Sequence, residues 1–173
     1  MPIEDGFFAA YNLSKSLVER SAWAFMVDHP EATFDLLTTM PGLVIGPNLF
    51  QTSSQEISGS NGILWNILTT GLTDPFWQTN VHVQDVARAH VAALDKDKVA
   101  GGRYLLNGSN EPWSYALEYA KKRWPGRKWA EKETVGLPFK WDSSKAKREM
   151  GIDWIPIEKQ INDVVEQMIA LGA

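Results

Sequence analysis

The sequence lacks cysteine, and this absence excludes disulfides, thiolate catalysis and cysteine-based metal sites. No apolar run approaches the ~18 residues of a membrane-spanning helix. The first residues, MPIEDGFFAA, have no basic stretch followed by an apolar run, so no secretory signal is predicted. The only histidines, His29, His82 and His90, do not have metal-ligand spacing. We therefore expect a cytoplasmic protein without a bound metal.

A large excess of charge of one sign is also absent, since 17 Lys and Arg residues nearly balance 21 Asp and Glu residues. The net charge of −4 gives no support for nucleic-acid binding. With 173 residues, 44% of them hydrophobic and 22% charged, the chain fits one ordinary globular domain. Eight tryptophans supply large apolar surfaces that must be buried or covered.

Hydrophobic periodicity predicts a mixed α/β fold with more helix than strand. Helices are predicted over residues 9–28, 61–71, 83–96, 111–125, 141–151 and 156–172. The nearly continuous apolar run 34–44 predicts a buried strand, and shorter strands are predicted near 80–83 and 104–107. About three strands are too few for a self-sufficient sheet with helices on both faces.

Tyr11 and Lys15 are the first candidate functional residues. Their spacing of four places both side chains on one face of the predicted helix 9–28. A tyrosine can protonate a carbonyl oxygen, but its usual pKa of about 10 is high for this task, and a nearby cation stabilises the phenolate. Taken alone, the pair also fits a half-buried tyrosine beside a solvated lysine on an ordinary amphipathic helix.

Several segments together are more specific than this pair. They are YNLSKSLVERSAWAF, FDLLTTMPGLVIGP, VHVQDVARAHVAAL, GRYLLNGS and DSSKAKREMGIDWIPIEKQINDVV. In this order they resemble the second half of the extended short-chain dehydrogenase/reductases, in particular fungal aldehyde and methylglyoxal reductases and plant dihydroflavonol and cinnamoyl-CoA reductases. The resemblance spans about residues 7–172 and implies the C-terminal half of a Rossmann-type fold.

The resemblance also implies roles for individual residues. Tyr11 would be the catalytic acid, and Lys15 would assist it and hold the cofactor ribose. Pro41, Gly42 and Val44 would lie near the nicotinamide of NADPH, mostly through backbone groups. Our interpretation of the aromatic and apolar residues between 48 and 80 is a substrate wall, with plain core packing as an equally weighted alternative. The wall residues are Ile63, Trp65, Phe76 and Trp77.

The family's Gly-rich dinucleotide loop and its catalytic serine have no counterpart here. Gly101–Gly102 precedes a predicted strand, and the stretch 58–62 follows a loop, so neither has the required strand–turn–helix context. The family also usually has Asp and Arg where this chain has His82 and Gln84. Asp85 is expected to cap the helix that follows it, and His90 is expected to be a hydrogen-bonded core residue.

These observations predict a single truncated domain over 1–173. Residues 1–47 would form the catalytic helix and a strand of the Rossmann sheet, and residues 48–173 would form mainly the substrate-binding region. Three hypotheses stay open: a fragment of a reductase, a split reductase completed by another chain, or a repurposed cofactor-free binder or catalyst of an apolar small molecule. An interaction module with a vestigial pocket is a further alternative. Because an uncovered apolar face and sheet edge seek a partner, we expect a symmetric homodimer or a complementing chain.

Overall fold

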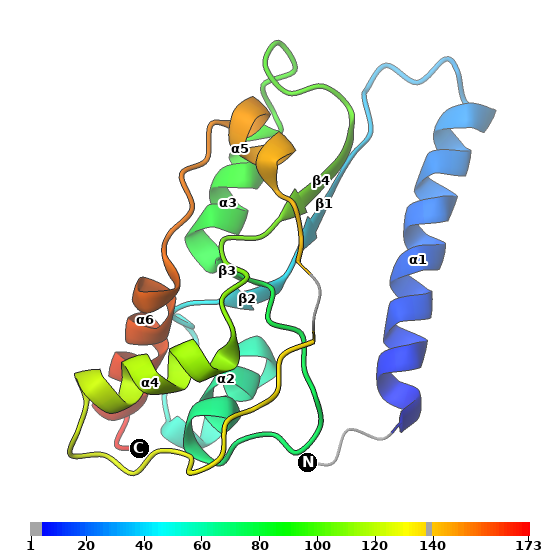
Figure 1. Cartoon of the computed structure of the whole chain (residues 1–173). Helices are drawn as coiled ribbons and strands as arrows, with labels where there is room; N and C mark the ends of the chain where they lie inside the picture. Colours follow the sequence, from blue (N-terminus) through cyan, green and yellow to red (C-terminus); the bar gives the residue numbers. More distant parts are fainter. Residues whose placement is uncertain (1–4, 138–139) are drawn as a thin grey trace.

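The computed structural model describes residues 5–137 and 140–173 and has α/β architecture (Figure 1). The helices are α1 (Asp5–Asp28), α2 (Gly59–Thr69), α3 (Val83–Ala92), α4 (Trp113–Arg123), α5 (Ser144–Met150) and α6 (Ile157–Ala170). The strands are β1 (Leu37–Pro41), β2 (Leu43–Ile45), β3 (Asn80–His82) and β4 (Gly102–Leu106), and a short 3-10 turn spans Ser54–Glu56. The α/β class with few parallel strands is thus confirmed.

The strands form two parallel pairs rather than one continuous sheet. β1 pairs with β4, from Leu37 opposite Gly102 to Pro41 opposite Leu106. β2 pairs with β3, from Leu43 opposite Asn80 to Ile45 opposite His82. The single strand expected over 34–44 is therefore divided at Gly42. At this residue the chain leaves one partner and takes up the other.

Gly42 makes this change of partner possible because it has no side chain. Its N–H donates to Leu106 O at 3.0 Å, and the next N–H, of Leu43, donates to Thr79 O at 3.0 Å. A Cβ atom at position 42 would lie only 2.9 Å from Thr79 O. The close approach of these two backbones thus requires glycine.

Two apolar clusters hold the main body together. The larger one joins α2, α4 and α6 around Leu64, Trp113 and Ile161, all of them fully buried. The smaller one packs α3 and α5 against the strands around Val81, Tyr104 and Ala146. At about 25 cal/mol for each Å² of apolar surface removed from water, such burial is the main stabilising contribution.

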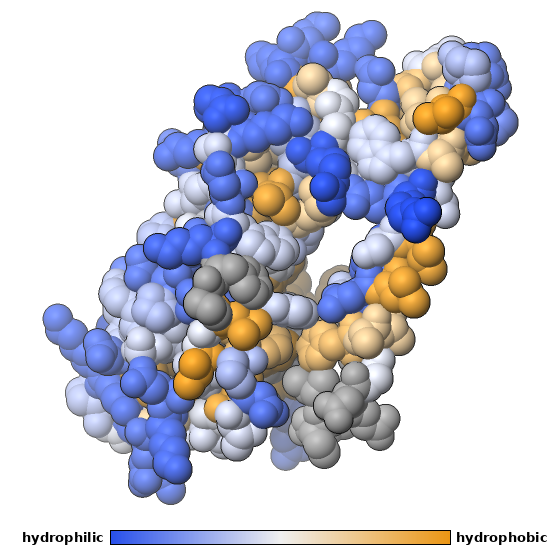
Figure 2. Space-filling view, turned by 45° about the vertical axis from the view of Figure 1, so that its right-hand side comes forward, coloured by the Kyte–Doolittle hydropathy of each residue, from blue (hydrophilic) through white to orange (hydrophobic). Residues whose placement is uncertain are grey.

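α1 stands apart from this body (Figure 1). Its 24 residues carry no fully buried side chain among those that the structure describes. Apolar side chains gather along the helix at the surface, with open space between its middle and the rest of the molecule (Figure 2). A helix with apolar residues on all sides is normally buried, so this one lacks part of its usual cover.

Candidate functional site

Tyr11 and Lys15 lie together on α1, as their spacing predicts. The Lys15 ammonium nitrogen is 5.5 Å from the centroid of the Tyr11 ring. The Tyr11 side chain is 48% exposed, and Lys15 is exposed as well. A phenol and a cation are thus held side by side on a rigid helix and are open to an incoming molecule.

An aromatic cluster contacts α1 one turn before Tyr11. The Phe8 ring packs edge-on against Phe76 and Trp77, with centroid distances of 6.2 and 5.6 Å. The ring centroids of Phe76 and Trp77 are 5.5 Å apart. The Trp77 backbone is fixed in turn, because its carbonyl accepts a hydrogen bond from Trp113 Nε1 at 3.0 Å. Two of the four predicted wall residues are therefore brought next to the helix that carries Tyr11.

The other two predicted wall residues pack elsewhere. Ile63 and Trp65 both lie on α2 and pack against the larger apolar cluster. Trp65 is 6.2 Å from Trp129, ring centroid to ring centroid, in an edge-on arrangement. A cavity of about 280 Å³ adjoins these two indoles, and its lining contains neither Tyr11 nor Lys15. The aromatic cluster formed by Phe8, Phe76 and Trp77 contains neither Ile63 nor Trp65.

The segment from Pro41 to Val44 lies at the carboxyl end of β1 and the start of β2. Carboxyl ends of parallel strands are where α/β folds bind ligands. Pro41 has no N–H, however, and the N–H groups of Gly42 and Leu43 already donate within the protein. Val44 is half-buried against the smaller cluster. These residues can shape a nicotinamide site, but most of their backbone N–H groups already make hydrogen bonds within the protein. The exposed Lys15 ammonium, in contrast, has donors that fit ribose hydroxyls.

One ion pair fastens α1 to the β1–β4 pair. Arg103 on β4 donates to both carboxylate oxygens of Glu19, at 2.7 and 3.1 Å, and Thr38 Oγ1 on β1 donates to Glu19 Oε1 at 3.1 Å. The hydrogen bond from Arg103 lowers the pKa of Glu19 more than any other contact does. No sequence pattern links positions so far apart in the chain, so sequence reasoning could not assign this anchoring role.

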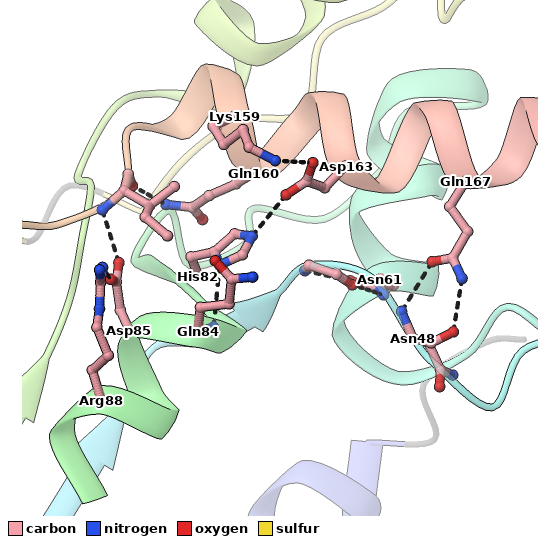
Figure 3. A network of polar contacts seen from close by, with 12 residues as sticks. Asn48, Asn61, His82, Gln84, Asp85, Arg88, Lys159, Gln160, Asp163 and Gln167 are labelled. Atoms are coloured by element: carbon pink, nitrogen blue, oxygen red, sulfur yellow. Dashed lines mark hydrogen bonds and ion pairs between the residues drawn. The ribbon is translucent and has the colours of Figure 1, made fainter. Parts of the chain in front are cut away.

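The cap of α3 is provided by His82 and not, as was expected, by Asp85 (Figure 3). His82 Nδ1 accepts a hydrogen bond from the Gln84 N–H at 3.1 Å, so His82 caps α3 and Asp85 does not. Because Nδ1 is the acceptor, Nε2 carries the proton and donates to Asp163 Oδ2 on α6 at 2.9 Å. Asp85 is buried and instead accepts from the Ile155 N–H at 2.8 Å and from Arg88.

His90 also departs from its expected place in the core. It is exposed, and its Nδ1 lies 2.7 Å from the Val86 carbonyl oxygen one turn earlier. His90 is exposed because α3 packs against the rest of the protein through Asp85 and Ala89, and His90 lies on another side of the helix.

The exposed Tyr11 hydroxyl, with the Lys15 ammonium beside its ring, is chemically able to donate a proton to a carbonyl oxygen. Within residues 5–137 and 140–173, no group of three or more His, Cys, Asp or Glu side chains could hold a metal ion. Among the helices of the same residues, none has the length and apolar character to cross a membrane.

Comparison with known proteins adds a family context. No protein-family model matches the chain. Ketoreductase sphI of Aspergillus fumigatus is 32% identical over 167 residues, which cover 92% of this chain and 49% of that protein. A putative NADPH-dependent methylglyoxal reductase of Candida albicans, GRP2, is 27% identical and is matched over 93% of this chain and 50% of its own length.

Matches to solved structures also span nearly all of this chain and about half of the matched chain. Vestitone reductase from alfalfa superposes with a TM-score of 0.76 at 23% identity, over 96% of this chain and 53% of that one. At this identity the likeness establishes the fold alone. The chain spans about half the length of the curated relatives it matches.

Proposed function

Since the chain belongs to the extended short-chain dehydrogenase/reductase family, we propose that it carries the proton-donating and substrate-binding side of an NADPH-dependent carbonyl reductase. The supporting observation is the Lys15 ammonium beside the Tyr11 ring on an accessible helix face. Relatives of the same family include a ketoreductase and a methylglyoxal reductase. An aldehyde or a ketone is therefore the proposed substrate class.

In the proposed reaction NADPH, when bound, supplies a hydride to the carbonyl carbon. The Tyr11 hydroxyl donates its proton to the carbonyl oxygen, and the Lys15 ammonium stabilises the phenolate that remains. Lys15 would also donate hydrogen bonds to the ribose hydroxyls of the cofactor, and Pro41, Gly42 and Val44 would lie beside its nicotinamide. Phe76 and Trp77 form the apolar wall next to Tyr11, held against α1 through Phe8.

We propose that this chain does not reduce carbonyls by itself. Most contacts of a dinucleotide belong to the Gly-rich half that the matched region does not include. The N–H donors of Gly42 and Leu43 are already used inside the protein. Activity of residues 1–173 would therefore need a dinucleotide site and a catalytic serine that further residues or a second chain supply.

The pattern of apolar residues on α1 supports two different partners for this helix. Phe8, Glu19 and Met26 share the side that faces the body. Tyr11, Val18 and Phe25 repeat every seven residues and form a second stripe, and Leu13 and Leu17 lie on a third side. All five of these stripe residues are exposed. We propose that the Tyr11 stripe receives a complementing dinucleotide-binding chain and that the Leu13–Leu17 side receives α1 of a second copy.

A complementation assay tests the reductase proposal. The purified chain is mixed with NADPH and methylglyoxal, alone or with the N-terminal half of the Aspergillus ketoreductase, and NADPH consumption is followed. We expect turnover only in the mixture, and we expect Tyr11→Phe to abolish it. Asn12→Ala, one residue away on an exposed position, is the matched control and should retain turnover.

The other outcomes separate the alternatives. Turnover or micromolar NADPH binding by the chain alone would refute the need for a second chain. No turnover in the mixture, with the complex formed and the chain folded, would refute the reductase proposal. It would favour a cofactor-free binder of apolar molecules at the cluster formed by Phe8, Phe76 and Trp77.

A further inference from the structure

A polar cavity of about 690 Å³ lies where β4 ends, outside the site described above. Its wall comes from the loop after β4, from the segment before α5 and from the start of α5. The lining includes two indoles, two lysines and two carboxylates, namely Trp141, Trp154, Lys140, Lys147, Glu111 and Asp142. Charges of both signs thus face the same space as two large aromatic surfaces.

One residue of the cavity lining, Asn107, has a side-chain oxygen that accepts no hydrogen bond from the described residues. The Asn110 side chain pairs with the Trp141 backbone: its Oδ1 accepts from the Trp141 N–H at 3.0 Å, and its Nδ2 donates to the Trp141 carbonyl at 3.2 Å. Asn110 Oδ1 is therefore an acceptor, and the Asn107 atom 2.8 Å from it must be the donor Nδ2. Asn107 Oδ1 then points elsewhere and has no partner among the described residues, although Asn107 is only 3% exposed.

An acceptor of this kind requires an explanation, because a buried polar atom without a hydrogen bond costs free energy. Asn107 is one of the residues that line the cavity. The second contact of Asn107 Nδ2, to the Trp141 carbonyl, is already 3.5 Å long. A donor that reaches Oδ1 from the cavity would satisfy this acceptor, and the weak Nδ2 contact would allow the amide to adjust.

The aromatic part of the wall is held in place before any ligand arrives. The paired hydrogen bonds from Asn110 fix the Trp141 backbone. Two residues later, Ser143 Oγ donates to the Asn107 carbonyl at 2.6 Å and ties the same two segments together again. A wall that is ordered in advance lowers the entropy cost of binding.

The charges of the lining limit what can bind. Hydrogen bonds from the Ser144 backbone and hydroxyl lower the pKa of Asp142, so this carboxylate is charged near neutral pH. A purely anionic ligand would be repelled by Asp142 and Glu111. A purely apolar ligand would remove water from the charged groups and leave Asn107 Oδ1 without a hydrogen bond, and both effects would disfavour its binding.

We propose that this cavity binds a polyhydroxylated ring, such as a sugar. Each sugar hydroxyl both donates and accepts, so it can donate to Asn107 Oδ1 or Asp142 and accept from Lys140 or Lys147. The C–H face of the ring would lie against the Trp141 indole, which offers a large apolar surface on a fixed backbone. The cavity is thereby assigned a ligand class different from the aldehyde or ketone proposed at Tyr11.

Ligand-observed saturation-transfer NMR with the full chain and methyl β-glucopyranoside tests this proposal. We expect transfer to the ring protons of the sugar and none to methoxycyclohexane, which has the same ring size without the hydroxyl groups. Trp141→Leu should weaken binding about tenfold, as expected for loss of an aromatic contact. Trp124→Leu removes an indole outside this cavity and should leave binding unchanged.

A second variant guards against loss of the fold. Lys147 is exposed, and among the described residues its side chain has only a long ion pair, 3.6 Å to Asp153, so Lys147→Ala should fold normally and weaken sugar binding severalfold. Absence of transfer to the sugar, equal transfer to methoxycyclohexane, or equal binding by the Trp141 and Trp124 variants would overturn the proposal. Competition of the sugar by inorganic phosphate would instead identify an anion site and would also overturn it.

Discussion

At the scale of single residues, His82 shows how one side chain can join distant elements. It is completely buried, accepts from the start of α3 through Nδ1 and donates to α6 through Nε2. Lys159 also binds Asp163, so the carboxylate that receives His82 is itself held in place (Figure 3). The network connects the β2–β3 pair to the last helix of the chain.

Replacing His82 by aspartate is predicted to destabilise the protein. The new carboxylate would be buried beside Asp163, with no proton to donate to it. We expect a loss of about 3 kcal/mol in the free energy of unfolding, measured by urea denaturation at neutral pH. His82→Asn, which can still cap α3 and carries no charge, should lose only about 1–2 kcal/mol. Equal losses for the two variants would contradict the electrostatic explanation.

Tyr104 gives a prediction about alkaline pH. Burial and, secondarily, the hydrogen bond to Glu149 Oε2 at 2.6 Å raise its pKa to about 12. The unfolded chain, with a tyrosine pKa of about 10, releases this proton first, so stability is present below about pH 10 and is lost as the pH rises toward 12.

Tyr104→Phe should remove this part of the pH dependence. Between about pH 10 and pH 12 the free energy of unfolding of the native protein should fall more steeply than that of the variant. Tyr115, whose pKa is also raised to about 12 by its hydrogen bond to Glu158, is present in both proteins and cancels in the comparison. Parallel urea-unfolding curves over this range would show that Tyr104 does not control the alkaline loss.

At the scale of elements, the division between β1 and β2 depends on one residue. Gly42→Ala would place a methyl group 2.9 Å from the Thr79 carbonyl oxygen, and both groups belong to paired backbones that cannot easily shift. We expect a loss of about 1–3 kcal/mol in thermal or urea denaturation. Gly62→Ala is the matched control: it lies inside α2, its Cβ would be 3.6 Å from the nearest atom, and helix propensity favours alanine by about 0.5–1 kcal/mol. A Gly42 variant as stable as the native protein would refute the close approach.

The elements also show where sequence reasoning succeeds and where it stops. The helical period of the apolar residues predicts α2, α4 and α6 closely, and the spacing of Tyr11 and Lys15 predicts that they share a face. The same local patterns cannot reveal the break at Gly42, because the break depends on the backbone at Thr79. They also miss the cap by His82, because Asp85 has the more typical capping side chain and only its contact with Ile155 explains why it is used elsewhere.

In the candidate site, too, local features could be predicted from the sequence and long-range contacts could not. The helix and the spacing of Tyr11 and Lys15 are local features, so the sequence contains them. The contact of Phe8 with Phe76 and Trp77 and the anchoring of Glu19 by Arg103 join segments far apart in the chain. Such contacts depend on how the elements pack, and no spacing in a single sequence encodes them. For this reason Phe76 and Trp77 could not be separated in advance from Ile63 and Trp65.

At the scale of the whole molecule, α1 carries the strongest prediction. Leu13 and Leu17 are exposed on a helix that the body covers on one side only. Exposed apolar surface of this kind favours self-association, and a two-fold arrangement lets the same helix face meet itself. We therefore expect the purified chain to form a dimer by light scattering and sedimentation equilibrium, in an equilibrium that shifts toward monomer on dilution.

Leu17→Glu should convert the dimer into a monomer, since it places a charge in the centre of the proposed contact. Val91→Glu introduces the same charge at another exposed apolar position, on α3, and should leave the dimer intact. Both variants should retain the helical circular dichroism of the native chain, because neither residue is buried within it. A native chain that remains monomeric at every concentration, or a dimer that survives Leu17→Glu, would exclude α1 self-pairing. The apolar sides of α1 would then be assigned to a complementing chain alone, and the turnover assay in the mixture would measure that partnership directly.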